Sequence, residues 1–443
     1  MKKILSALLV LVMVLSLAAC GGDKKDDVST DESTGLVSSE DTEQASGDDA
    51  SKDDDDKEVS SEDAEPQDDV DLSKIKVGLI CLHDENSTYD LNFIDAMKQT
   101  QKALNLRDDQ IIYKKNVAEK NDCYEAAVDL VDRGCNVIFA DSFGHEPYMI
   151  QAAKEFKNVQ FCHSTGTRAH TENLPNYHNA FASIYQGRYL AGIAAGMKLN
   201  EMIAAGKFKE DEAKMGYVGA YTYAEVISGY TSFYLGAKSV CPSVTMDVQF
   251  TGSWYDEAKE KEAAIKLIES GCKLISQHAD SMGAPTACED RDIPNVSYNG
   301  STLSACPKTF IVSSRICWSP YYELAIKSVA AGKAIPADWC GGIKEGSVVL
   351  TDVNEAVAAK GTQEAINAAI EKFNAGELDV FVTDNFTVEG EKLTSFVADV
   401  DTDDKYTPDT EVISDGVFHE STERSAPYFT LRIDGINTLN EKF

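Results

Sequence analysis

The feature that most constrains the fold is a repeated alternation of short apolar runs and amphipathic segments. The apolar runs have strand length and are nearly continuous, as in strands covered on both faces. In the first half of the chain they are 76–82, 110–114, 135–140 and 159–163. Segments with helical spacing separate them, at 93–104, 124–133 and 148–156. This order predicts an α/β protein with a parallel sheet and right-handed crossovers.

The alternation restarts further along the chain. The strands predicted in this second set are 214–219, 245–250 and 273–277, and the helices are 185–198, 226–239 and 254–270. Gly134 and Gly271 directly follow helical segments, where glycine commonly ends a helix. Two such sets predict two lobes, each a parallel sheet flanked by helices. Ligands of such sheets bind outside the carboxyl ends of the strands, so we expect a ligand cleft between the lobes.

The first 20 residues are typical of an export signal. Lys2 and Lys3 precede a short apolar run, and Leu17-Ala18-Ala19-Cys20 resembles the lipobox of bacterial lipoproteins. The run is too short for a stable membrane span. We therefore expect residues 1–19 to be a signal peptide and Cys20 to be lipidated, anchoring the chain at the extracytoplasmic face of the cell membrane. An ordinary secreted protein with a cysteine near its cleavage site is the alternative.

An acidic stretch follows, and we expect residues 20–72 to be a disordered tether. Residues 21–72 contain 21 acidic and 4 basic side chains and no aromatic one, so about half of the net charge of −33 lies there. Such a composition cannot bury enough apolar surface to offset the entropy of ordering. A solvated spacer is favoured over an acidic interaction tail. The run Asp53 to Asp56 lacks the glycine-punctuated spacing of a cation site. The acidic balance also argues against nucleic-acid binding, which needs basic patches.

The remaining residues, 73–443, are long enough for two lobes with separate cores. Ten cysteines remain besides Cys20, and several lie in apolar runs, where a free cysteine behaves as a small hydrophobe. Buried thiols are expected, with one or two disulfides left open. We have no functional interpretation for residues 388–443.

Several short stretches, taken in their order, carry a resemblance to a known family. They include Val77-Gly78-Leu79-Ile80, Gly187-Arg188-Tyr189-Leu190-Ala191-Gly192, Gly216-Tyr217-Val218-Gly219, Phe233-Tyr234-Leu235-Gly236-Ala237-Lys238, Gly252-Ser253-Trp254-Tyr255-Asp256 and Gln277-His278-Ala279-Asp280-Ser281. From about Lys74 to about Thr387 the chain resembles the basic membrane protein family of substrate-binding lipoproteins of ABC importers. That group includes the purine-nucleoside receptors.

The resemblance implies a two-lobed periplasmic-binding-protein type I fold with the ligand in the interlobe cleft. The first lobe would comprise about 73–178 and 298–345, and the second about 179–297 and 346–443. The implied ligand is a purine nucleoside, and the implied partners are an ABC permease and its ATPase. A monomer without a cofactor is expected.

Polar residues after the predicted strands of the first lobe are candidate ligand contacts. The resemblance implies an Asn at a helix start, where this chain has Asn92. It also implies a Phe that stacks on the ligand; Leu91 stands there, so Tyr89 is the nearest aromatic. Asp141 and Ser142 follow the third predicted strand, and Asp141 is expected to accept a hydrogen bond from a base N–H or a ribose hydroxyl. Helix capping is the alternative for such residues.

The second lobe offers aromatic side chains and one carboxylate. Tyr223 follows a predicted strand, where an aromatic ring suits a planar ligand. Tyr230 aligns roughly with an aromatic of the family's ring sandwich, with helix core as the alternative. Trp254 either covers the ligand or packs between helices. Asp280 is expected to accept two vicinal ribose hydroxyls, since one carboxylate has room for both.

Two further candidates rest on the resemblance alone. Asn299 stands where the family carries an Asp that reads the ligand, so a charge is lost at this position. Arg315 lies where the chain is expected to cross between the lobes, near the place of a basic residue that contacts the ribose. An interlobe ion pair is the alternative for Arg315.

Catalysis finds little support in the sequence. His163, His170 and His178 have 6 and 7 residues between them, which fits neither a helical i, i+4 pair nor common zinc spacings. There is no Gly-x-Ser-x-Gly elbow and no Walker loop. We therefore predict no catalytic residue and no metal site. Two alternatives remain: a ligand-sensing receptor of the same fold, and an importer receptor for another small polar metabolite. Lobe closure serves sensing as well as import, so the sequence does not separate these two roles.

Overall fold

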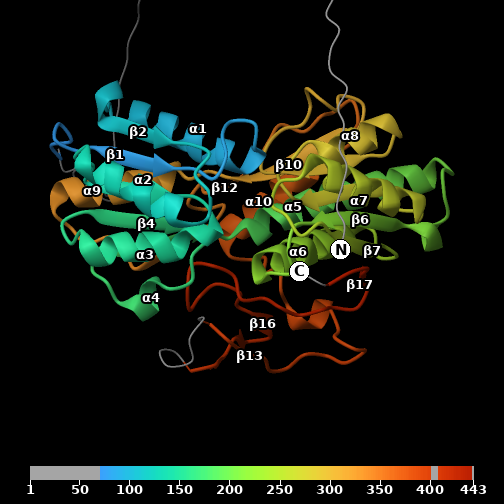
Figure 1. Ribbon diagram of the computed structural model, residues 1–443. Coiled ribbons are helices and arrows are strands. Elements are labelled where there is room, and N and C mark those ends of the chain that lie inside the picture. Colours follow the sequence, from blue (N-terminus) through green and yellow to red (C-terminus); the bar gives the residue numbers. More distant parts are fainter. Residues whose placement is uncertain (1–69, 401–407, 442–443) are drawn as a thin grey trace, which may run out of the picture. The chain divides into compact units, whose positions relative to one another are not determined.

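The computed structural model describes residues 70–400 and 408–441 (Figure 1). The predicted signal peptide, Cys20 and nearly all of the predicted tether lie outside these residues. Within the described part of the chain, no helix is both long and apolar enough to cross a membrane. All ten cysteines of this part are free, eight of them buried, so the disulfides left open by the sequence do not form here.

The first sheet has six parallel strands in the order β11-β5-β4-β3-β1-β2. Its strands are β1 (Val77–Ile80), β2 (Ile111–Lys114), β3 (Val137–Ala140), β4 (Gln160–Ser164), β5 (Tyr177–Ala182) and β11 (Asp338–Gly341). Two apolar clusters cover its faces, one built with α1 (Thr88–Ala103) and α9 (Ser319–Ala331), the other with α2 (Asn121–Asp132) and α3 (Glu146–Glu155). The short helix α4 (Ala169–Glu172) follows β4.

The second sheet has seven strands in the order β12-β10-β9-β8-β6-β7-β17, of which only β12 runs antiparallel to its neighbour. Its strands are β6 (Lys214–Gly219), β7 (Thr245–Phe250), β8 (Leu274–His278), β9 (Asn295–Tyr298), β10 (Phe310–Ile316), β12 (Val348–Leu350) and β17 (Ile436–Thr438). Helices α5 (Ile184–Ala204), α6 (Ala224–Val240) and α10 (Thr362–Ala375) share one apolar cluster with it, and α7 (Glu257–Glu269) and α8 (Gly283–Asp290) share another.

Glycines allow α5 and α6 to pack closely. A Cβ atom on Gly192 would lie 2.1 Å from the carbonyl oxygen of Phe233, and one on Gly236 would lie 2.1 Å from that of Tyr189. Such distances are shorter than any real contact, so the two backbones touch and no larger residue fits. This packing fixes the start of α6, which reaches the candidate site described below.

Most predicted elements form, and the differences lie at their ends. The strands predicted at 214–219 and 245–250 are confirmed as β6 and β7. Helix α1 begins at Thr88, before the predicted start, because the Ser87 hydroxyl caps it by accepting from Asp90 N at 3.2 Å. Helix α7 begins at Glu257, after the predicted start, because the Asp256 side chain caps it. Gly134 and Gly271 follow their helices with positive φ, as expected.

Membership of the two sheets differs from the predicted lobe boundaries at two places. Strand β5 belongs to the first sheet as far as Ala182, beyond the predicted boundary at 178. Strand β10 belongs to the second sheet, although 298–345 was assigned to the first lobe. The cause is that β10 continues in parallel beside β9, so the chain returns to the first sheet only after Ile316.

The C-terminal segment adds to the second sheet. Strand β17 joins the edge of that sheet, parallel to β7. Two short antiparallel pairs precede it, β13 (Val397–Ala398) with β14 (Thr410–Glu411) and β15 (Ile413–Ser414) with β16 (Val417–Phe418). The side chains of Phe418 and Phe429 are buried in the cluster shared with α5 and α6.

Candidate functional site

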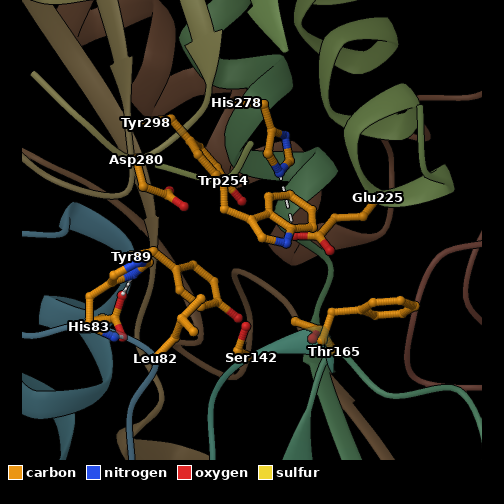
Figure 2. Close-up of a pocket in the computed structure, with 12 residues that line it drawn as sticks. Leu82, His83, Tyr89, Ser142, Thr165, Glu225, Trp254, His278, Asp280 and Tyr298 are labelled. Atoms are coloured by element: carbon orange, nitrogen blue, oxygen red, sulfur yellow. Dashed lines mark hydrogen bonds and ion pairs between the residues drawn. The ribbon is translucent and has the colours of Figure 1, made fainter. Parts of the chain in front are cut away.

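A cavity is lined by residues at the carboxyl ends of both sheets (Figure 2). From the first sheet, which we call the first wall, come Leu82, His83, Tyr89, Asp90, Ser142, Phe143 and Thr165. From the second sheet and α6, the second wall, come Glu225, Trp254, His278, Asp280 and Tyr298. The space measures about 390 Å³ with its open mouth.

Hydrogen bonds join the two walls beside the cavity. The backbone N–H and the hydroxyl of Thr88 both donate to the carbonyl oxygen of Asp280, at 3.3 and 3.1 Å. The amide of Asn92 donates to Asn299 Oδ1 at 3.3 Å, and Asn299 Nδ2 donates to Asp280 Oδ1 at 3.1 Å. Asn299 has a φ of +63°, which turns the chain at the end of β9. This buried chain places the Asp280 carboxyl group at the cavity.

Asp90 supplies an ionised carboxylate to the first wall. Its Oδ1 accepts a hydrogen bond from the backbone N–H of His83 at 2.7 Å, and the His83 ring lies 3.4 Å from Oδ2. Burial opposes ionisation of Asp90, but the hydrogen bonds from His83 and Ser87 outweigh it and lower the pKa below its usual value. Asp90 is therefore a hydrogen-bond acceptor at neutral pH.

The second wall has its own carboxyl group, that of Asp280, whose pKa is shifted in the opposite direction. Burial raises its pKa well above the usual value, and the negative charges of Glu260 and Asp90 add to the effect. The hydrogen bond from Asn299 opposes the rise but does not cancel it. Asp280 thus tends to keep its proton and can donate as well as accept.

Glu225 is oriented by a neutral histidine. Burial lowers the pKa of His278, so its ring is uncharged at neutral pH. Its Nε2 lies 3.4 Å from Glu225 Oε1, while a Cβ on Gly229 would lie 2.6 Å from its Nδ1. Because a carboxylate oxygen accepts, we assign the proton of the neutral ring to Nε2, which then donates to Glu225.

Tyr298 is held by a buried cation. The Arg188 guanidinium lies 5.2 Å from the centre of the Tyr298 ring, and its Nη1 donates to the carbonyl oxygen of Ser297 at 3.2 Å. The His278 ring packs 4.3 Å from the Tyr298 ring. The Tyr298 hydroxyl is buried and has no partner within the described residues, so it can bond to a ligand.

Aromatic side chains close the cavity and its mouth. On the first wall, the Tyr89 hydroxyl donates to the carbonyl oxygen of Asp141 at 2.6 Å. At the mouth, Tyr223 is 41% exposed and stacks on Tyr221 with ring centres 5.1 Å apart. Phe143, from the other sheet, lies 5.3 Å from Tyr223. The ring centre of Trp254 lies 5.1 Å from that of Tyr221 and 5.9 Å from that of Tyr223.

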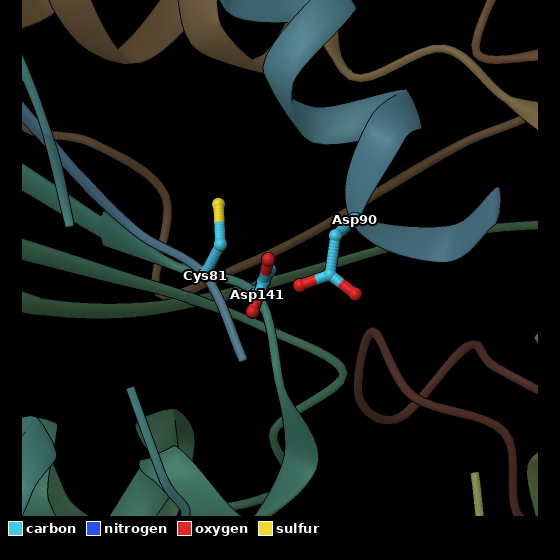
Figure 3. Close-up of side chains that lie close together, drawn as sticks. All are labelled: Cys81, Asp90 and Asp141. Carbon is cyan, nitrogen blue, oxygen red and sulfur yellow. The ribbon is translucent and has the colours of Figure 1, made fainter. Parts of the chain in front are cut away.

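Behind the first wall lies a buried group of two carboxyls and a thiol (Figure 3). Cys81, Asp90 and Asp141 each have a potential metal-ligand atom within 4.8 Å of the others. Burial raises the pKa of Cys81, and burial together with the charge of Asp90 raises that of Asp141. These shifts favour a protonated thiol and a protonated Asp141 carboxyl beside the ionised Asp90.

The structure distributes the sequence-predicted residues among three places. Tyr89, Ser142, Trp254 and Asp280 line the cavity. Asn92, Asn299 and Asp141 lie behind its lining, in the hydrogen bonds described above. Tyr223 covers the mouth through its contact with Phe143, instead of facing the cavity.

Tyr230 and Arg315 are not brought to the cavity. Tyr230 is 1% exposed and packs between Tyr217 and Phe250, with ring centres 5.9 and 6.4 Å away. It faces the apolar cluster that α5, α6 and α10 share with the second sheet, because this side of α6 packs toward β6 and β7. Arg315 lies within β10 and pairs with Val349 of β12, since β10 belongs to the second sheet and not to a crossing.

Several lining residues were not selected from the sequence. They are Leu82, His83, Asp90, Phe143, Thr165, Glu225, His278 and Tyr298. All but Asp90 and Glu225, which lie in the first turns of helices, stand at or just after the end of a strand. Asp141 and Asp280 were candidates because each follows a predicted strand. The same criterion would have selected Thr165, which follows a predicted strand, and Tyr298, which ends an apolar one.

Comparison with known proteins agrees with this fold. A family model described as ABC transporter substrate-binding protein PnrA-like (Bmp) matches residues 81–378. A purine-binding protein of Brucella abortus is 32% identical over 312 residues, covering 70% of this chain and 83% of that protein. A putative ABC transporter glucose-binding protein of Haloferax volcanii is 29% identical over 271 residues, covering 60% of this chain and 65% of that protein.

Solved structures show the same fold. A solute-binding protein of an ABC transporter system from Conexibacter woesei matches with a TM-score of 0.56 at 20% identity, covering 69% of this chain and 98% of its own. One from Aeropyrum pernix matches with a TM-score of 0.57 at 16% identity, covering 69% and 92%. The family match identifies the class as a substrate-binding protein of an ABC transporter, a non-enzymatic role. The chain belongs to the Bmp family of PnrA-like substrate-binding proteins.

Proposed function

We propose that this protein captures a purine nucleoside outside the cytoplasm and delivers it to an ABC permease. The observation that carries the proposal is the lining of the cavity, which combines aromatic rings with carboxyl groups. Tyr89, Trp254 and Tyr298 offer flat apolar surfaces, and Asp90, Glu225 and Asp280 offer acceptors. Among the described residues that line the cavity, none is Lys or Arg.

This lining suits a neutral, planar ligand with several N–H or O–H groups. Aromatic faces favour a purine ring, and the carboxyl groups can accept from ribose hydroxyls and base N–H groups. A phosphate would place its charge beside acidic side chains without a compensating cation. The name of the Brucella abortus relative, a purine-binding protein, supports the same class.

A hexose is the second candidate. Carboxyl groups that accept from hydroxyls, next to aromatic rings, also suit a sugar, and the Haloferax volcanii relative is named as a putative glucose-binding protein. Native mass spectrometry of the freshly purified full chain separates the two. The proposal predicts a co-purifying compound with the mass of a purine nucleoside. A hexose mass would favour the second candidate, and a compound of neither class would overturn both.

The anchor belongs to the same proposal and rests on the sequence, because Cys20 lies outside the described residues. Cys20→Ala should abolish lipidation and release the protein from the membrane fraction. Metabolic labelling with a fatty acid and fractionation of cells measure both effects. A variant that stays in the membrane fraction as fully as the parent would place the anchor elsewhere.

A further inference from the structure

Thr165 combines a strained backbone with an unpartnered hydroxyl. Its φ is +69°, a left-handed conformation that β-branched residues adopt only rarely. The residue is 4% exposed, and its Oγ1 has no hydrogen-bond partner within the described residues. It follows β4 directly and lines the cavity near Ser142 (Figure 2). Strain of this kind persists where the surrounding structure imposes it, and it clusters at functional sites.

The surroundings do impose this conformation. Just after Thr165, the buried carboxylate of Glu146 accepts from the backbone N–H groups of Thr167 and Arg168 at 2.9 and 3.0 Å. Asn179 Oδ1 also accepts from Arg168 N, at 3.0 Å. A Cβ on Gly166 would lie 2.1 Å from Asn179 Nδ2, so no side chain fits there. These contacts hold the chain in place directly after Thr165.

We propose that Thr165 is a specificity-determining residue of this site, whose hydroxyl donates to an acceptor atom of the bound ligand. The inference rests on the proposed function and specifies its chemistry. The neighbouring Ser142 hydroxyl is already engaged, donating to Glu119 Oε1 at 2.6 Å. Thr165 is therefore the hydroxyl of the first wall that remains for a ligand.

The other hydroxyl groups among the described residues of the first wall, those of Tyr89 and Ser142, already donate to protein atoms. Ionised Asp90 can only accept hydrogen bonds, whereas a hydroxyl can donate and accept. Purine rings carry acceptor nitrogens as well as N–H groups, so a wall of carboxylates alone would leave those nitrogens unpaired after burial. The Thr165 hydroxyl, buried without a partner among the described residues in the lining of the cavity, can supply such a donor from the first wall, as the Tyr298 hydroxyl can from the second.

Three variants test the assignment by calorimetric titration with adenosine and by thermal unfolding. Thr165→Gly removes the hydroxyl and the strain together. Its affinity should fall about tenfold, while its Tm is no lower than that of the parent. Thr165→Ser keeps the hydroxyl and should bind within about threefold of the parent. Asp292→Gly, which relieves a positive φ (+51°) at an exposed turn outside the cavity lining, should bind like the parent.

Parental affinity in Thr165→Gly, or equal losses in Thr165→Gly and Thr165→Ser, would overturn the assignment. If Thr165→Gly fails to fold, Thr165→Val replaces it, because it removes the hydroxyl and keeps the branched shape of the side chain. Parental affinity in this variant would overturn the assignment, and loss of binding with a normal Tm would support it. A parent that binds no purine would instead refute the proposed function. Retention of the co-purified compound by Thr165→Ser, but not by Thr165→Gly, would then still support the role of Thr165, and equal retention would refute it.

Discussion

Asp90 and Asp280 line one cavity from opposite walls, yet their surroundings push their pKa values in opposite directions. Asp90 receives a backbone N–H from His83 and a hydrogen bond from Ser87, so its pKa is lowered in spite of burial. Asp280 receives one side-chain donor, Asn299, and lies among other acids, so its pKa is raised well above the usual value. The comparison teaches that the number of donors, more than burial, decides which carboxyl is ionised.

The largest effect is expected from Asp90→Asn. The amide removes the charge to which His83 and any ligand N–H donate, and it turns an acceptor into a partial donor. We expect adenosine affinity to fall roughly 10- to 100-fold, since hydrogen bonds to charged groups contribute roughly 1.5–3 kcal/mol. Calorimetry measures the loss, with Asp95→Asn on the solvent-exposed side of the same helix as the control. Parental affinity would show that the charge of Asp90 is not used.

Asp280→Ala should have the next largest effect. It removes the group that the Asn92 and Asn299 chain places at the cavity. We expect a loss of at least about tenfold in affinity for adenosine, roughly 1.4 kcal/mol, with an intact fold by circular dichroism. An unchanged affinity would remove Asp280 from the ligand contacts.

Asp280→Asn sharpens the comparison, because an amide resembles a protonated carboxyl group in shape and in its ability to donate. At this position it should change affinity by less than about threefold, in contrast to Asp90→Asn. The same titration measures both variants. Equal losses at the two positions would contradict opposite protonation states on the two walls.

The smallest effect concerns stability against pH at Glu260, behind Asp280. Burial raises the pKa of Glu260 from 4.5 to about 7. The folded state therefore holds this proton more tightly than the unfolded state, so the stability it contributes is present below pH 4.5 and is lost as pH rises to about 7. Between pH 5 and pH 8, Glu260→Gln should lose less free energy of unfolding than the parent in urea titrations. As the control, Glu262→Gln, exposed on the same helix, should show the same pH dependence of the free energy of unfolding as the parent. If Glu260→Gln also showed the parent's pH dependence, burial would not shift the pKa of Glu260.

Much of the fold follows from residue patterns that act locally. Strand β6 was predictable from its apolar run, and β7 from the alternation of Met246, Val248 and Phe250 with polar residues. The place of β10 was not, because its sheet is decided by pairing with β9, far from any local signal. The residues of the candidate site also differ in how far local patterns predict their positions. Asp280 and Trp254 follow strand ends, whereas Tyr230 was a candidate through the resemblance alone, with helix core as its alternative, and it lies in the core.

The central claim is that the two walls enclose a purine nucleoside without altering it. Calorimetric titration of the purified full chain with adenosine, guanosine and inosine tests this most directly, with chromatography of the ligand recovered afterwards. We predict binding of at least one nucleoside at one site per chain, with the nucleoside recovered unchanged. No heat from any of the three, or recovery of a modified compound, would contradict the account.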